Sequence, residues 1–180
     1  IQLGTTATAD EITDTAITQP LVVVSALLAF EAMTGAGLVP ADTVMAGHSV
    51  GELAAAAIAG VLTSDEAVNL AAIRGAEMAK ACALAETGMS AVLGGDEEAV
   101  LARLTELELV AANRNAAGQI VAAGSREALA ALAANPPERA RIRELSVAGA
   151  FHTAYMGPAQ DAVTAAAAAI TPGEPTRTLL

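Results

Sequence analysis

The pentapeptide Gly47-His48-Ser49-Val50-Gly51 is the stretch of this sequence whose residue types most clearly indicate chemistry. It follows a short apolar run at 43–46 and precedes an alanine-rich run at 52–60. A G-x-S-x-G motif between a strand and a helix is typical of a nucleophile elbow, in which the serine hydroxyl projects from a strained turn. We expect a glycine on each side because the two backbones crowd together there. The helix that follows would direct free N–H groups at negative charge near Ser49, and the Val50 amide is the first candidate for an oxyanion hole. An ordinary strand-to-helix turn is the alternative.

A serine hydroxyl is a weak nucleophile at its free pKa, so Ser49 needs a general base. The sequence has two histidines, His48 and His152. Adjacent side chains on a tight turn point apart, so we expect His48 to form hydrogen bonds within its own loop. His152 follows a glycine-led loop after a predicted strand, and beside an elbow serine it is the favoured base. Asp161 is expected to be solvated on a helix, so we predict a Ser–His dyad whose imidazole is held by a carbonyl or an amide.

Arg74 is the third group with chemical potential. Its guanidinium lies within a mainly apolar predicted helix, where it is suited to holding a carboxylate through two hydrogen bonds. The alternative is an ion pair with Glu77 or Glu52, and the spacing alone favours that alternative.

Composition excludes several function classes. The formal net charge of −11 argues against a nucleic-acid-binding protein, which needs a basic face, and against docking on anionic membranes. The single cysteine, Cys82, permits no disulfide within the chain and fits a reducing compartment; we expect it to fill space as a small hydrophobe. We see no signal peptide and no apolar run that we expect to span a bilayer, so we predict a cytoplasmic protein.

The elements that position these residues predict an α/β fold. We expect a buried helix that begins at Thr18-Gln19-Pro20 and ends at Gly35. The elbow strand and helix are expected at 42–46 and 50–59. A capping box of Thr63 and Glu66 then begins the helix that carries Arg74.

The middle of the chain predicts a separate unit. Strands and helices alternate there in the order βαββαβ, which is a ferredoxin-like arrangement. The expected elements are strand 89–93, helix 96–106, strands 109–113 and 119–123, helix 125–134 and strand 141–147. A last helix is expected at 158–170. We therefore predict a core at 1–86, an inserted small subdomain at 87–147 and a return of the core at 148–180, in a chain truncated at both ends.

Taken together, these motifs resemble the malonyl-CoA:acyl carrier protein transacylases and the acyltransferase domains of polyketide and fatty-acid synthases. The resemblance covers nearly all of the chain. It rests on Thr18-Gln19-Pro20, Gly47 to Glu52, Arg74-Gly75, Gly88-Met89, Asn113, Asn115, Gly118-Gln119, Phe151-His152-Thr153, Met156 and Pro158.

The resemblance implies an α/β-hydrolase-like core with a parallel sheet, interrupted by the ferredoxin-like subdomain. It implies that Ser49 carries the acyl group, that His152 is general base and acid, and that Arg74 binds the free carboxylate of a malonyl substrate. It also makes the Val50 amide half of the oxyanion hole. The Gly-Gln-Gly loop that supplies the family's other amide is not in this sequence, nor are the C-terminal strands of the sheet.

The same resemblance suggests substrates and partners. His48, Phe151 and Asn113 would line the substrate site, and Phe151 together with Val50 looks like the malonyl version. Malonyl-CoA and the phosphopantetheine of an acyl carrier protein would be the substrates, with no bound cofactor and no metal, and we expect a monomer.

The carrier protein needs a surface on which to dock. A basic cluster of Arg139, Arg141 and Arg143 is the candidate, and a solvated edge strand is an equally good explanation of the same residues.

Three other functions stay open at this point. One is a serine esterase or thioesterase, and another is a non-catalytic copy that only binds a carrier. A third is an acyltransferase that serves polyketide rather than fatty-acid synthesis.

Overall fold

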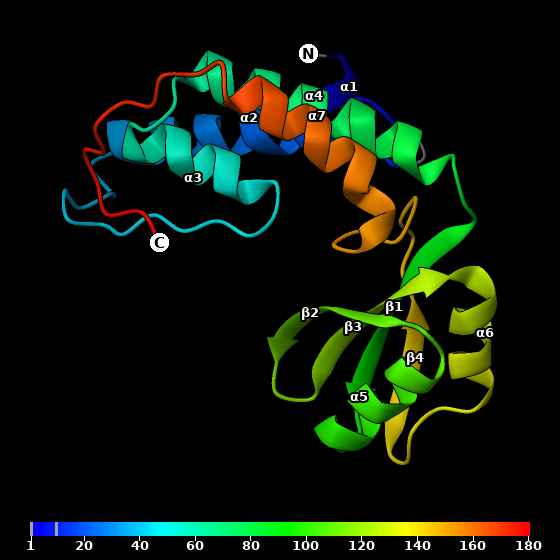
Figure 1. Cartoon of the computed structure of the whole chain (residues 1–180). Coiled ribbons are helices and arrows are strands. Elements are labelled where there is room, and N and C mark those ends of the chain that lie inside the picture. Colours follow the sequence, from blue (N-terminus) through cyan, green and yellow to red (C-terminus); the bar gives the residue numbers. More distant parts are fainter. Residues whose placement is uncertain (1, 10) are drawn as a thin grey trace. The chain divides into compact units, whose positions relative to one another are not determined.

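The computed structural model describes residues 2–9 and 11–180. These residues form two compact units (Figure 1): the chain up to Met78 together with Ala159–Leu180, and the intervening Ala79–Pro158. The second unit contains the segment 87–147 that the sequence predicts as a small subdomain, while the predicted boundaries themselves stay a prediction.

The first unit is helical. It contains α1 (Gln2–Thr5), α2 (Thr15–Gly35), α3 (Gly51–Ala59), most of α4 (Ser64–Cys82) and most of α7 (Gly157–Ala167). Its core is built from small side chains, with Val23, Ala54, Ala67 and Ala71 in one cluster and Met45, Ala55 and Ala59 in another. Closely packed helices with small side chains therefore fill this core, which in many proteins is filled by large aromatic residues.

Helix α2 begins three residues earlier than the sequence analysis predicts. The Asp14 carboxylate accepts a hydrogen bond from the Ala16 amide at 2.8 Å, so Asp14 caps the helix and Thr15 is its first residue. Pro20 consequently lies inside α2 rather than in its first turn. The preference for proline early in a helix misled the prediction, because the carboxylate cap upstream decides where this helix starts.

The expectation that α2 is buried is wrong for the described residues. Its buried residues are Thr15, Gln19 and Val23, which recur every four positions, while Leu28 remains 60% exposed. A single stripe packs, although the helix is apolar nearly all round. The expectation of no membrane-length apolar run is also corrected, since an 18-residue window of the 21-residue helix α2 reaches a mean hydropathy of 1.7. By length and composition alone this helix could span a bilayer, a criterion that core helices of soluble proteins also meet.

The elbow strand is reduced to one parallel bridge between Met45 and Leu179. The Met45 amide donates to the Thr178 carbonyl at 2.8 Å, and the Leu180 amide donates to the Met45 carbonyl at 3.0 Å. Arg177 supports this return of the chain by stacking 5.5 Å from the centroid of the Phe30 ring. Two segments far apart in the sequence are thus paired side by side, in parallel, directly before the elbow.

The second unit is a four-stranded antiparallel sheet with two helices, in the predicted βαββαβ order (Figure 1). The strand order is β2-β3-β1-β4, so the hairpin strand β3 lies between β1 and β2. Its elements are β1 (Thr87–Gly94), α5 (Glu97–Glu106), β2 (Val110–Ala116), β3 (Gln119–Ser125), α6 (Arg126–Ala134), β4 (Ala140–Glu144) and the 3-10 turn η1 (Ala154–Met156).

The sheet of the second unit has two differently covered faces. On one face the main core joins sheet and helix residues, among them Val92, Ile120, Leu104 and Leu132. On the other face Met89 and Val121 pack against Ala150 and Phe151, which belong to the segment that leaves β4. This second face therefore anchors the loop that carries His152.

Candidate active site

Ser49 lies on a strained turn between the parallel bridge and α3. Its φ angle is 56°, in the left-handed region that residues with a side chain rarely adopt. The Gly51 amide donates to the His48 carbonyl at 3.0 Å and the Glu52 amide donates to the Ser49 carbonyl at 3.1 Å, which closes the turn and begins the helix. Such strain persists where the surrounding structure enforces it, commonly at functional positions. The strained turn that the sequence predicts at Ser49 is confirmed.

The two glycines of the motif have different roles. A Cβ on Gly47 would lie 2.3 Å from the backbone carbonyl group of Gly51, so position 47 accepts no side chain. A Cβ on Gly51 would meet nothing within 4 Å among the described residues. The expectation that both glycines relieve crowding is therefore corrected. Only the first lies where strand and helix backbones meet.

The start of α3 exposes an amide suited to an oxyanion. Val50 is the residue at the N-terminal cap of this helix. Within residues 2–9 and 11–180, the Val50 amide donates no hydrogen bond, whereas the next two amides are used in the turn. The amide is thus available at the positive end of the helix dipole, beside the serine.

Arg74 on α4 contacts the serine directly. Its Nη2 donates to Ser49 Oγ at 3.0 Å, and its Nη1 donates to Gln19 Oε1 at 2.5 Å. Spacing alone favoured an ion pair with Glu77 or Glu52, whereas these two hydrogen bonds go to neutral side chains. Burial lowers the pKa of Arg74, and the charge of Glu52 partly offsets this effect. An arginine keeps its proton at neutral pH even so, which leaves a half-buried cation beside the hydroxyl.

Gln19 is a residue of this site that the sequence analysis did not assign. It belongs to the Thr18-Gln19-Pro20 motif, which predicts a helix start. A glutamine beside a long apolar stretch is a signal in the sequence, whereas its contact with Arg74, 55 residues away, could not be predicted.

His152 lies on an anchored loop of the second unit. Its φ angle is 58°, so it is a second residue with a side chain in the left-handed region. The Ala150 amide donates to Thr87 Oγ1 at 3.1 Å, and Thr153 Oγ1 donates to the Ala150 carbonyl at 2.6 Å. These bonds fix the backbone on both sides of the histidine, whose side chain is exposed.

Cys82 packs against this loop. A Cβ on Gly149 would lie 2.5 Å from Cys82 Sγ, so the thiol fills the space that the glycine leaves. This contact agrees with a packing role for the cysteine and explains why the loop begins with glycine.

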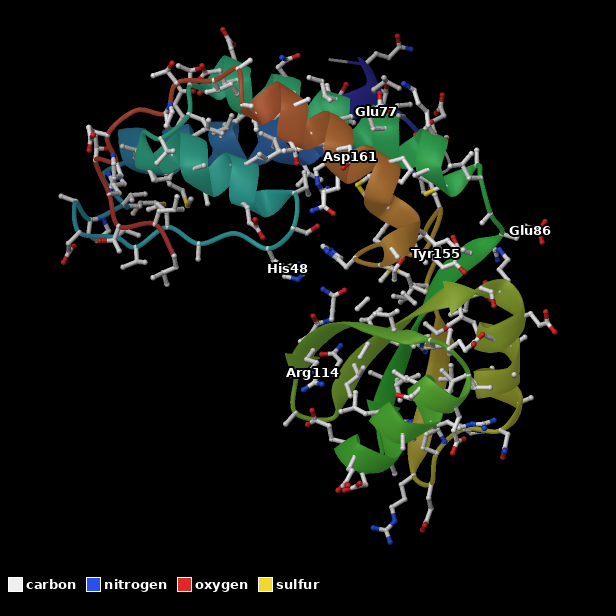
Figure 2. The ribbon with its side chains drawn as sticks, in the orientation of Figure 1. His48, Glu77, Glu86, Arg114, Tyr155 and Asp161 are labelled. Atoms are coloured by element: carbon white, nitrogen blue, oxygen red, sulfur yellow. The ribbon has the colours of Figure 1, made fainter. Side chains whose placement is uncertain are left out.

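The other predicted substrate residues lie in both units. Asn113 pairs with Val121 across β2 and β3, so its side chain shares the sheet face on which Phe151 packs. His48 is exposed on the loop that leads into α3 (Figure 2). Asp161 is exposed on α7, as expected. The structure thus brings Ser49 and Arg74 together in one unit, and gathers Phe151, Asn113 and His152 in the other.

Metal ligands were not expected at this site. Within the described part of the chain, no cluster of three or more histidine, cysteine, aspartate or glutamate side chains is arranged to hold a metal ion.

Comparisons with known proteins agree with this arrangement. Residues 4–179 match the acyl transferase domain family. A malonyl CoA-acyl carrier protein transacylase of Mycolicibacterium smegmatis is 66% identical over 178 residues, which are 99% of this chain and 61% of that protein. The crystal structure of MCAT from Mycobacterium tuberculosis superposes with a TM-score of 0.93 at 62% identity, covering 99% of this chain and 60% of that one. A malonyl-transacylase solved in complex with a type II PKS acyl-carrier protein has a TM-score of 0.87 at 28% identity, over 99% of this chain and 59% of that one.

The solved relatives share the mixed fold of helices and an antiparallel sheet with this chain. The chain belongs to the acyl transferase domain family. It spans about three fifths of the length of the relatives that it matches.

Proposed function

We propose that the protein containing this chain transfers a malonyl group from malonyl-CoA to the phosphopantetheine thiol of an acyl carrier protein, through an acyl-Ser49 intermediate. The contact between Arg74 Nη2 and Ser49 Oγ carries the proposal, because it joins a nucleophile to a cation that can select an acyl group with a free carboxylate. Relatives named as malonyl CoA-acyl carrier protein transacylases support the same activity.

The mechanism follows from the chemistry of the site. His152 takes the hydroxyl proton of Ser49, whose Oγ attacks the thioester carbonyl carbon. The carbonyl oxygen becomes an oxyanion that the Val50 amide stabilises. As the tetrahedral intermediate collapses, the C–S bond breaks and the CoA thiolate takes the proton from His152. The carrier thiol then gives its proton to His152, attacks the Ser49 ester, and releases the serine by the same steps in reverse. No redox partner is needed.

The position of Arg74 favours a short diacid. In a malonyl ester a single methylene separates the ester carbonyl from the carboxylate. A guanidinium that already touches Ser49 Oγ at 3.0 Å is within reach of that carboxylate after a small side-chain adjustment. A planar guanidinium also matches a carboxylate with two parallel hydrogen bonds. An acetyl ester would leave the half-buried cation without its charged partner, which is the physical basis of selection.

We also propose that the core of the full protein is an α/β-hydrolase-like parallel sheet. The parallel bridge of Met45 with Leu179, placed directly before the elbow, supports this. In such sheets the nucleophile follows the end of a parallel strand. The pairing of Ser49 with His152 as a dyad is proposed from chemistry alone, because a serine nucleophile needs a general base.

The carrier protein is proposed to dock on β4. Arg141 and Arg143 are exposed and alternate with Ile142, which packs toward the helix-covered core. Their partners across the ladder are Leu93 and Ala91 of β1, so both arginines lie on the sheet face that also holds Phe151. An acidic carrier would find here a positive edge on an otherwise acidic chain.

Arg139 fits this patch less well. It lies on the turn before β4 and forms an exposed ion pair with Glu138.

The cytoplasmic location and the monomeric state expected from the sequence remain predictions.

The experiment that tests the activity compares acceptors. Full-length protein is mixed with labelled malonyl-CoA, with and without a phosphopantetheinylated carrier protein. Labelled carrier, formed faster than free malonate, supports the transacylase. Free malonate formed at the same rate with and without carrier would instead identify a thioesterase, and neither product would identify a non-catalytic copy.

A further inference from the structure

Two buried polar residues of α2, Thr15 and Gln19, contact α4 at Gly75 and Arg74. The proposed reaction does not explain these contacts. Gln19 is 5% exposed, and its amide bridges two residues of α4. Its Oε1 accepts from Arg74 Nη1 at 2.5 Å, while its Nε2 donates to Met78 Sδ at 3.1 Å. Arg74 and Met78 are four residues apart and therefore lie on the same face of α4.

The orientation of this amide is dictated by its neighbours. A guanidinium has only N–H donors, so the carbonyl oxygen of Gln19 must face Arg74. The NH₂ group then faces Met78, whose sulfur is a weak acceptor. A glutamine whose two ends are both engaged has little freedom to rotate, and it therefore holds one edge of the guanidinium in place.

The backbones of α2 and α4 approach closely at the same point. Thr15 Oγ1 donates to the Gly75 carbonyl at 2.8 Å. A Cβ on Gly75 would lie 2.3 Å from the Thr15 carbonyl oxygen, so the contact requires glycine next to Arg74. The contact that brings Gln19 to Arg74 is therefore built into the crossing of the two helices.

We propose that Gln19 is a positioning residue that sets selectivity for acyl groups with a free carboxylate. It fixes Nη1 of Arg74 and so points the remaining N–H groups of the guanidinium at Ser49, where the carboxylate of a bound acyl group arrives. The inference rests on the proposed function, because it concerns the acyl group carried by Ser49. Binding energy that is available only to a correctly placed carboxylate then favours malonyl over acetyl transfer.

Three variants of the full-length protein test this. Gln19→Leu removes both hydrogen bonds at similar volume, and Gln19→Glu offers Arg74 a competing carboxylate. Thr15→Val is the matched control, because it removes a buried hydrogen bond from the same helix contact and leaves the side-chain partners of Arg74 in place. For each protein we would measure the initial rates of malonyl and acetyl adduct formation by intact mass, together with the melting temperature.

We expect both Gln19 variants to lower the ratio of malonyl to acetyl adduct by about tenfold or more. Without Gln19 to hold it, the Arg74 guanidinium no longer forms a well-aligned hydrogen bond to the carboxylate of the malonyl group. Thr15→Val should lower the melting temperature and keep the ratio. An unchanged ratio in Gln19→Leu, or an equal loss of both adducts that follows the melting temperature, would overturn the positioning role while leaving the acyl-serine intact. If the wild-type protein formed neither adduct, the proposed function would fail and the inference with it.

Discussion

Arg74 Nη2 lies 3.0 Å from Ser49 Oγ, which links the middle of α4 to the turn that precedes α3. The arginine lies 25 residues beyond the serine in the sequence, and it also donates a hydrogen bond to the neutral amide of Gln19. This contact places the Arg74 cation beside the hydroxyl of the elbow serine. The contact with Ser49 thus explains why a mainly apolar helix has an arginine near its centre.

Replacing Arg74 should change which acyl group is accepted more than whether one is accepted. In Arg74→Ala we expect malonyl loading to fall by about 10- to 100-fold, which corresponds to the loss of a charge-assisted hydrogen bond of about 1.5–3 kcal/mol. Acetyl loading should fall much less. Initial rates with both thioesters check this, and Arg103→Ala on α5 is a control that also removes one arginine. Equal losses with the two thioesters would remove Arg74 as the selector.

The two glycines of the elbow should respond differently to alanine. Gly47→Ala places a Cβ against the backbone of Gly51, so we expect a loss of about 1–3 kcal/mol in the free energy of unfolding. Gly51→Ala meets open space, and alanine is the better helix former by up to about 1 kcal/mol. Chemical unfolding curves of the two variants provide the comparison. A variant pair with equal midpoints would show that the elbow adapts to a side chain at position 47.

Much of this arrangement could be predicted from residues that act locally. The Thr63–Glu66 capping box, the βαββαβ order and the strained turn at Ser49 depend on neighbours in sequence, and all three are confirmed. The start of α2 could not be placed because two capping residues compete within four positions, and Asp14 prevails.

Contacts between distant segments escaped prediction. Gln19 bonds to Arg74 across 55 residues, and the open space beside Gly51 depends on what packs around α3. Burial of α2 was overestimated because hydrophobic composition reports what a helix is able to bury, whereas the partner decides which stripe is buried.

The exposed arginines of β4, Arg141 and Arg143, should affect only the second half of the reaction, in which the malonyl group passes from Ser49 to the carrier protein. We expect the double change Arg141→Glu and Arg143→Glu to slow malonyl transfer to the carrier by about tenfold at low salt. Formation of the malonyl-enzyme should be unaffected. The difference from wild type should shrink as salt rises, because exposed charges are screened.

A matched control has the same change of charge elsewhere. Arg114→Glu with Arg126→Glu alters two exposed arginines that are paired with Glu97 and Glu144. If both double variants slow transfer equally, net charge rather than a docking surface is responsible.

The capping box gives the stability of α4 a defined pH dependence. The Thr63 backbone amide and then its hydroxyl lower the pKa of Glu66 from the ordinary value of 4.5 by hydrogen bonds to the carboxylate. A lowered pKa means that the ionised form stabilises the folded state. The contribution is therefore complete above the unfolded value and is lost as pH falls through the folded one.

Glu66→Gln should consequently lower the unfolding midpoint near neutral pH. The gap from wild type should narrow as pH falls below the ordinary value of 4.5, and it should close only after pH has fallen through the lowered pKa of the folded carboxylate. Thermal unfolding over this pH range measures the effect. A gap that stayed constant with pH would show that the carboxylate charge does not contribute.

Ser49 is proposed to carry the acyl group, and intact mass spectrometry detects that covalent adduct itself. Full-length protein and its Ser49→Ala variant are mixed briefly with malonyl-CoA, quenched in acid and weighed, and the adduct is located by peptide mapping. We expect one malonyl adduct on the wild-type peptide that contains Ser49 and none on the variant. An adduct of equal yield on Ser49→Ala, or one mapped to another residue, would contradict it.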